Sequence, residues 1–191
     1  MQWRNSNDRF GWITGSLHWL MALLVIGLTA LGLWMTSLTY YSPYYTSAPF
    51  WHKSLGLVFA ALLLLRLIWR AATPFPEHLT THQRWERQLA TAAQWLMYAA
   101  MLLIVVSGYL ISTAKGRGVS LFGWFEVPAL VSNLPGQAQR AGALHYWLAL
   151  GLLGVAGIHA LGALKHHVLD KDNTLRRMLG MRLLNATEKG K

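Results

Sequence analysis

The chain has 191 residues, of which 54% are hydrophobic, and it contains no cysteine. The lack of cysteine excludes disulfides and thiolate-ligated metal, haem or iron–sulfur sites, so any cofactor must use nitrogen or oxygen ligands. The formal net charge of +10 at pH 7 is compatible with nucleic acid or with a membrane, and the positions of the basic residues decide between them.

The apolar residues gather in four runs separated by polar or aromatic stretches. The runs are Leu17 to Met35, Leu55 to Trp69, about Ala90 to Ile111, and Ala143 to Leu164. Each can cross a hydrocarbon layer of about 30 Å as a helix, the second run only with its flanking residues. We therefore expect an all-α fold, an integral membrane four-helix bundle over residues 1–180. Its helices should lie at about 15–36, 52–70, 90–112 and 142–166.

Basic residues are distributed unevenly between the two sides of such a bundle. Thirteen of the 17 lie before the first run, around the second connection or after the fourth run, and the outer side has only Lys53, Lys115, Arg117 and Arg140. Because cytoplasmic segments carry the excess of Lys and Arg, this asymmetry places both termini in the cytoplasm. The excess of basic residues is therefore explained by the orientation of the protein in the membrane. A lipid bilayer is expected as a partner, and nucleic acid is not. Residues 181–191 are expected to be a disordered cytoplasmic tail.

The longest outer loop runs from about residue 113 to residue 142. It contains the apolar stretch Val119 to Val131, which is too short to span a membrane. We expect this stretch to lie on the membrane face.

Four of the eight histidines lie in or at the edge of the apolar runs: His18, His52, His145 and His159. An ionisable side chain there is costly, which favours a function, although any one imidazole could simply hydrogen-bond to a neighbouring helix. His145 and His159 are 14 residues apart, so on one helix they point within about 40° of the same face at depths about 21 Å apart.

The direction of each helix then pairs the four histidines by depth. With the termini inside, His18 and His159 lie near the cytoplasm, whereas His52 and His145 lie near the periplasm. Two histidine pairs at two depths are the layout of two bis-imidazole haems in a helical bundle. Small residues on the fourth helix, with Gly27 and Gly32 on the first, could leave room for porphyrin planes, but close helix packing uses the same residues.

Four segments together give the chain a resemblance, over nearly its whole length, to the bacterial cytochrome b561 family. They are Ser16 to Trp19, His52 to Gly56, residues 108 to 113, and the long segment Lys165 to Arg176. The resemblance implies four transmembrane helices in the bacterial inner membrane and ubiquinone as electron partner. It also implies two b haems, with His18, His52, His145 and His159 as the bis-His ligands. A branch of the family oxidises superoxide, which implies an oxidoreductase of the superoxide:ubiquinone type.

Basic side chains are candidates for contact with the haem propionates. Arg66 and Arg70 share a face of the second helix near the cytoplasm. Either side chain could extend to lipid phosphate, and for Arg66 pairing with a haem propionate is an equally favoured alternative. On the outer side Lys53, Lys115 and Arg117 could pair with the other propionates or attract an anion such as superoxide. Ordinary loop solubility is the alternative for each of the three.

The four remaining histidines carry weaker signals. His166 and His167 lie where the fourth helix leaves the membrane, and a polar cap at the interface is favoured over a third cofactor. His78 and His82 lie in the second connection, where we expect surface residues, with metal binding as the less favoured alternative.

These patterns predict a membrane protein that transfers single electrons between a periplasmic-side donor and the quinone pool. A haem b membrane subunit that serves a periplasmic redox partner or dehydrogenase is the alternative. A haem-free transporter or scaffold, in which the histidines bind a substrate or a metal ion, is a third hypothesis.

Overall fold

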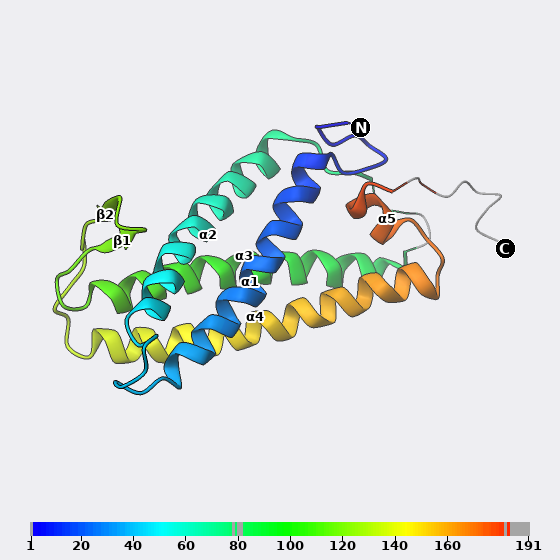
Figure 1. Cartoon of the computed structure of the whole chain (residues 1–191). Helices are drawn as coiled ribbons and strands as arrows, with labels where there is room; N and C mark the ends of the chain where they lie inside the picture. Colours follow the sequence, from blue (N-terminus) through cyan, green and yellow to red (C-terminus); the bar gives the residue numbers. More distant parts are fainter. Residues whose placement is uncertain (1, 78, 80–81, 182, 184–191) are drawn as a thin grey trace. The chain divides into compact units, whose positions relative to one another are not determined.

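The computed structural model describes residues 2–77, 79, 82–181 and 183, and Figure 1 shows the order of its helices and strands. The elements are α1 (Trp12–Thr36), α2 (Ser47–Ala72), α3 (Arg84–Thr113), β1 (Val119–Leu121), β2 (Phe125–Val127), α4 (Gln137–Val168) and α5 (Thr174–Leu179). His78 and most of the expected tail, residues 182 and 184–191, lie outside the described residues.

Within the described residues, α1 to α4 are long and apolar enough to cross a membrane. Their spanning windows have a mean hydropathy of 1.8 to 1.9, yet only 6% to 22% of each window is buried inside the protein. Large apolar side chains such as Leu23, Ile26 and Ile158 are more than half exposed. Exposed apolar surface on this scale is unfavourable in water and favourable in hydrocarbon, where a helix also satisfies every backbone polar group. The predicted all-α membrane bundle is confirmed, and the chain is a multi-pass membrane protein.

The chain divides into two compact units, and each of the four long helices contributes residues to both. Unit 1 comprises residues 1–20, 64–97 and 154–191, and unit 2 comprises residues 21–63 and 98–153. Unit 1 therefore holds His18 and His159, and unit 2 holds His52 and His145.

In unit 1 the residues before α1 fold back over the start of that helix. The side-chain oxygen of Asn5 accepts hydrogen bonds from the Gly11 backbone N–H at 2.9 Å and from the Thr14 hydroxyl at 2.7 Å. The Asn5 amide in turn donates to the Pro74 carbonyl oxygen at 3.0 Å. A Cβ at Gly11 would lie 2.5 Å from the backbone of Arg4, so this close approach requires glycine. One side chain thus ties the N-terminal lead to the beginning of α1 and to the segment after α2.

In unit 2 the apolar stretch of the longest loop forms a β-hairpin. Strands β1 and β2 pair antiparallel, with Val119 opposite Val127 and Leu121 opposite Phe125. In the turn that joins them, Phe122 and Gly123 have positive φ angles of 51° and 78°. Positive φ angles occur in hairpin turns whose twist matches that of the strands.

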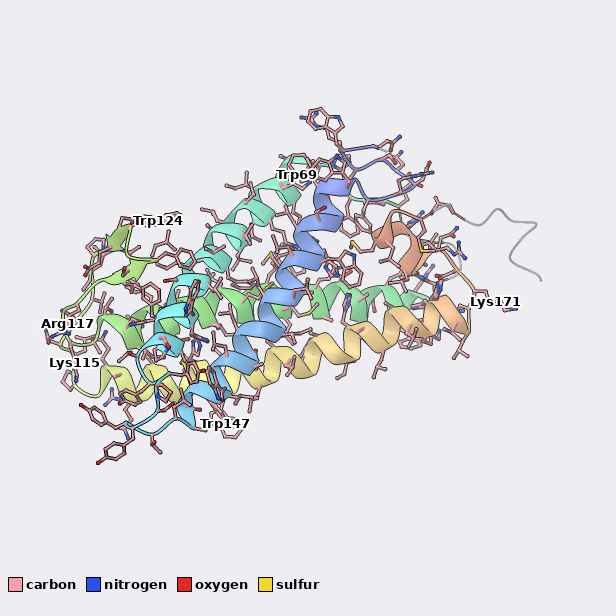
Figure 2. All side chains as sticks on the ribbon, in the orientation of Figure 1. Trp69, Lys115, Arg117, Trp124, Trp147 and Lys171 are labelled. Carbon is pink, nitrogen blue, oxygen red and sulfur yellow. The ribbon has the colours of Figure 1, made fainter. Side chains whose placement is uncertain are left out.

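A single buried hydroxyl fixes this hairpin to α2. Ser54 is fully buried; its Oγ accepts a hydrogen bond from the Phe122 backbone N–H at 3.0 Å and donates to the Ser120 carbonyl oxygen at 3.3 Å. The Trp124 side chain, in contrast, points away from the helices and is 83% exposed (Figure 2). The loop is therefore anchored at one edge and presents aromatic surface at the other.

Candidate functional site

In unit 2, His52 of α2 faces His145 of α4. Their ring centroids are 6.1 Å apart, and the ring planes are inclined by 70°. Two metal–imidazole bonds of about 2 Å, one on each side of a single ion, would place the ring centres about 6 Å apart. The separation of the two imidazoles therefore suits one metal ion between them.

Hydrogen bonds fix the tautomer and the orientation of His145. Its Nδ1 donates to the Ile104 carbonyl oxygen at 2.9 Å, and the Ser107 hydroxyl lies 3.2 Å from the same nitrogen. The Ser107 hydroxyl itself donates to the Ile104 carbonyl oxygen at 3.0 Å, and Ser107 is 1% exposed. With the proton on Nδ1, the lone pair is on Nε2, which is the usual arrangement of a metal-binding histidine. The sequence did not single out Ser107 or Ile104, although a serine inside a long apolar run was a signal.

Two glycines make room for these imidazoles. A Cβ at Gly108 would lie 3.0 Å from Cε1 of His145, and a Cβ at Gly32 would lie 3.2 Å from Cε1 of His52. Gly32 thus adjoins an imidazole, a role that the sequence did not predict. A Cβ at Gly27, in contrast, would meet no atom within 4 Å.

One nitrogen of His52 is buried without a hydrogen bond. The described residues offer no hydrogen-bond partner to its Nδ1, which lies inside the protein. The backbone of Leu28 in α1 is nevertheless close enough to interact with this imidazole.

In unit 1, His18 of α1 faces His159 of α4 in the same manner. Their ring centroids are 6.4 Å apart, and the ring planes are inclined by 65°. This spacing too suits one ion between two imidazoles. The four histidines are therefore adjacent in the same two pairs that their depth along the helices predicted.

Arg66 of α2 contacts the second pair. Its Nη2 lies 3.2 Å from Nδ1 of His18, and since a guanidinium can only donate, His18 accepts at Nδ1 and carries its proton on Nε2. Binding of a metal through Nε2 requires the other tautomer, so Arg66 would have to release this nitrogen. Arg70 has different partners: Nη1 donates to Gln94 at 3.4 Å, and the guanidinium lies over the rings of Phe75 and Trp95.

The basic residues expected on the outer side are exposed. Lys115 and Arg117 lie in the segment between α3 and β1, and their side chains point away from the helices (Figure 2). Lys53 follows His52 in α2 and is exposed as well. All three belong to unit 2, which also holds the pair of His52 and His145.

Unit 1 contains a second group of histidines that the sequence did not bring together. His82 was expected at the surface, and this prediction is wrong: its side chain is 16% exposed and its Nε2 lies 3.0 Å from Oδ2 of Asp172. The ring of His82 also lies against that of His166, with centroids 4.3 Å apart. His82 lies outside the helices, so no periodic pattern could predict this contact.

Charged residues surround His166 at the end of α4. Its Nδ1 lies 2.6 Å from Oδ2 of Asp170, and Lys165 contacts Asp170 and Glu86 at 2.8 Å each. The hydrogen bond from Lys165 lowers the pKa of the Asp170 carboxyl group below its usual value. His166 is thus part of a polar cluster, as expected for a cap at the interface. The Nδ1 of His167 is buried with no hydrogen-bond partner among the described residues.

Comparisons with known proteins show the family to which the chain belongs. A family described as prokaryotic cytochrome b561 matches residues 9–181. Cytochrome b561 homolog 2 of Escherichia coli (strain K12) is 45% identical over 180 residues, which cover 94% of this chain and 96% of that protein. The probable superoxide oxidase CybB of Yersinia pestis is 30% identical over 164 residues, which cover 85% of this chain and 91% of that protein.

Proposed function

Because the chain belongs to the prokaryotic cytochrome b561 family, whose membership implies haem b, we propose that it is a di-haem membrane cytochrome of the electron-transport chain. It would transfer electrons between a donor on the periplasmic side and the quinone pool. The observation that carries this proposal is the pair of facing imidazoles in each unit, with ring centroids 6.1 and 6.4 Å apart.

The residues fit two bis-histidine haems. His52 and His145 would hold one and His18 and His159 the other, and a bound haem b supplies a centre that accepts and donates single electrons. The hydrogen bond from His145 to Ile104 keeps Nε2 free for a metal and holds the ring in place. Gly32 and Gly108 leave the space that two of these imidazoles occupy.

Arg66 has two partners in this proposal. In the structure it donates to Nδ1 of His18. If His18 held iron through Nε2, its Nδ1 would carry the proton and could no longer accept from Arg66, whose guanidinium would then be able to pair with a haem propionate. Lys53 would be the corresponding cation near His52.

Superoxide is the electron donor that we favour. The relative from Yersinia pestis is named as a probable superoxide oxidase, and the exposed Lys53, Lys115 and Arg117 would attract a small anion. Ubiquinone is the acceptor that membership of this family suggests. The chemistry is then a superoxide:ubiquinone oxidoreduction, in which the protein conducts electrons and the quinone takes up protons.

The orientation that we propose follows from the basic residues. Thirteen of the 17 lie on the side of the termini, which supports an orientation with both termini in the cytoplasm. The inner membrane is the location that membership of the family suggests. His52, His145 and the basic outer residues would then face the periplasm.

An absorption spectrum of the purified protein tests the central point. We expect a sharp alpha band on reduction and two haems per chain by extraction. Reduction by a superoxide-generating system, followed by electron transfer to added ubiquinone, tests the donor and the acceptor. A protein without the alpha band overturns the haem proposal and leaves the transporter or scaffold hypothesis. A haem protein that superoxide does not reduce favours the subunit of a periplasmic dehydrogenase.

A further inference from the structure

Three atoms of metal-binding type converge in unit 1, and none of them belongs to the four paired histidines. They are Nε2 of His82, Nδ1 of His166 and Oδ2 of Asp172, and they all lie within 4.8 Å of one another. His82 precedes α3, His166 belongs to the last turn of α4, and Asp172 precedes α5. The residue before α3 and the segment from the end of α4 to the start of α5, far apart in the sequence, therefore present donor atoms to one point.

The separations of these atoms are close to those around a tetrahedral ion. Ligands at 2.0–2.1 Å from zinc in tetrahedral geometry are about 3.3 Å from one another. Oδ2 of Asp172 lies 3.0 Å from Nε2 of His82 and 3.7 Å from Nδ1 of His166. These two separations, with all three atoms within 4.8 Å of one another, are compatible with ligation of one ion.

Asp172 is held in the orientation that such a site needs. Its side chain is 0% exposed, and Oδ1 accepts a hydrogen bond from the Thr174 backbone N–H at 2.8 Å, at the start of α5. Oδ2 is the oxygen that lies near the two imidazoles. The backbone of α5 thus fixes one oxygen, and the other is directed at His82 and His166.

The two imidazoles leave access for an ion. Their side chains are 16% and 13% exposed, so an ion can enter from outside and a water molecule can complete the coordination. Asp170 offers a protein alternative for the fourth position, since its Oδ2 lies 2.6 Å from Nδ1 of His166. In the metal-free protein, Nε2 of His82 can donate to Oδ2 of Asp172 or to the Thr174 hydroxyl, both at 3.0 Å.

We propose that His82, His166 and Asp172 form a binding site for a divalent ion of the zinc class. Two imidazoles and one carboxylate suit zinc better than magnesium or calcium, which prefer all-oxygen sites. A bound ion would join the start of α3, the end of α4 and the beginning of α5. This site uses none of the histidines of the proposed haem sites, so it does not depend on the proposed function.

Zinc binding to the intact, haem-loaded protein in detergent tests the proposal. After equilibrium dialysis against zinc chloride, elemental analysis should give one zinc per chain above the haem iron. Removal of a group in the second coordination sphere typically weakens metal binding 10–100-fold, so loss of a direct ligand in His82→Ala or His166→Ala should weaken it by more than about 100-fold. His167→Ala is the matched control, because it removes the neighbouring imidazole and should bind zinc like the parent.

Asp172→Asn separates metal binding from folding. The amide oxygen can still accept the hydrogen bond from Thr174, so haem content and the thermal unfolding temperature without zinc should stay close to those of the parent. Zinc should raise the unfolding temperature of the parent and of His167→Ala, but not that of Asp172→Asn. If the parent binds no zinc, or if Asp172→Asn and His82→Ala bind it as tightly as the parent, the three residues form only a hydrogen-bonded cap.

Discussion

Nδ1 of His145 donates to the carbonyl oxygen of Ile104 at 2.9 Å, so the orientation of this imidazole is set by a backbone group one helix away. The hydroxyl of Ser107 lies 3.2 Å from the same nitrogen. A hydrogen bond at Nδ1 raises the basicity of a metal-binding imidazole and thereby favours the oxidised form of the metal. The two acceptors thus offer a direct way to test whether His145 binds haem.

Ser107→Ala should raise the midpoint potential of one haem and leave the other unchanged. The variant removes one acceptor near Nδ1 of His145 while Ile104 remains, so we expect a shift of no more than about 60 mV, which is a tenfold change in a one-electron equilibrium. A redox titration followed at the alpha band measures it. Ser112→Ala is the control, since its hydroxyl donates to the Gly108 carbonyl oxygen in the same helix. Equal potentials in Ser107→Ala and the parent would contradict the assignment.

Gly108→Ala should reduce haem content by displacing the imidazole of His145. The added Cβ would lie 3.0 Å from Cε1, and such overpacking costs about 1–3 kcal/mol. Gly32→Ala, whose Cβ would lie 3.2 Å from His52, should have a smaller effect of the same kind. Ser112→Ala in α3, which removes a hydroxyl bonded to the Gly108 carbonyl oxygen of the same helix, should retain full haem content. Haem per chain, measured after extraction, gives the comparison, and a loss in Ser112→Ala equal to that in Gly108→Ala would refute the interpretation.

Removal of either histidine of a pair should remove the same haem. His18→Ala and His159→Ala should each leave one haem per chain, and the double variant should lose no more than either single variant. His52→Ala and His145→Ala should remove the other haem. The reason is that the ring centroids of each pair are 6.4 and 6.1 Å apart, which is about the separation of two imidazoles bound to one metal ion. Retention of two haems per chain in any of the four single variants would show that the pairing does not describe the ligands.

A reporter fused after Lys191 should be active only in the cytoplasm. The basic excess on the side of the termini requires this orientation. A reporter inserted next to Gly123, in the turn of the hairpin, should be active only in the periplasm. The opposite pattern would exchange the two sides of the membrane and with them the proposed position of the electron donor.

Charge reversal of Lys115 and Arg117 should slow reduction by superoxide without lowering haem content. Both side chains are exposed, and a local positive field raises the encounter rate with a small anion. Since salt screens such a field, the rate should fall with ionic strength in the parent and hardly at all in the variant. A neutral reductant should show neither effect. If both proteins react equally fast at low salt, these residues are not the site of anion entry.

The membrane bundle and the pairing of His18 with His159 and of His52 with His145 could be predicted from sequence for one physical reason. A hydrocarbon layer admits only regular helices from such apolar runs, and helical rise then fixes the depth of each residue. The depth of a residue in a membrane-spanning helix can therefore be calculated from its number in the sequence.

The remaining features depend on irregular backbone or on close packing, and neither can be calculated from the spacing of residues along the sequence. The contact between His82 and His166 joins a residue outside the helices to the last turn of α4. Gly32 and Gly108 could equally have served helix packing, and only the positions of Cε1 in His52 and His145 distinguish the two roles. The hairpin had a local signal in Phe122 and Gly123, but its attachment to α2 is a long-range contact.

That attachment has a consequence for the order of biosynthesis. Ser54 and Ser120 are 66 residues apart in the chain, so at roughly 5–20 residues per second the ribosome needs on the order of several seconds to reach the hairpin after it has made Ser54. During this interval the Ser54 hydroxyl has neither of its final partners, and the carbonyl oxygen one turn back in its own helix is the acceptor within reach. Completion of the polar contacts of α2 must therefore wait until α3 has been made and the hairpin has folded. The helix that carries His52 enters the membrane early but reaches its final set of hydrogen bonds late.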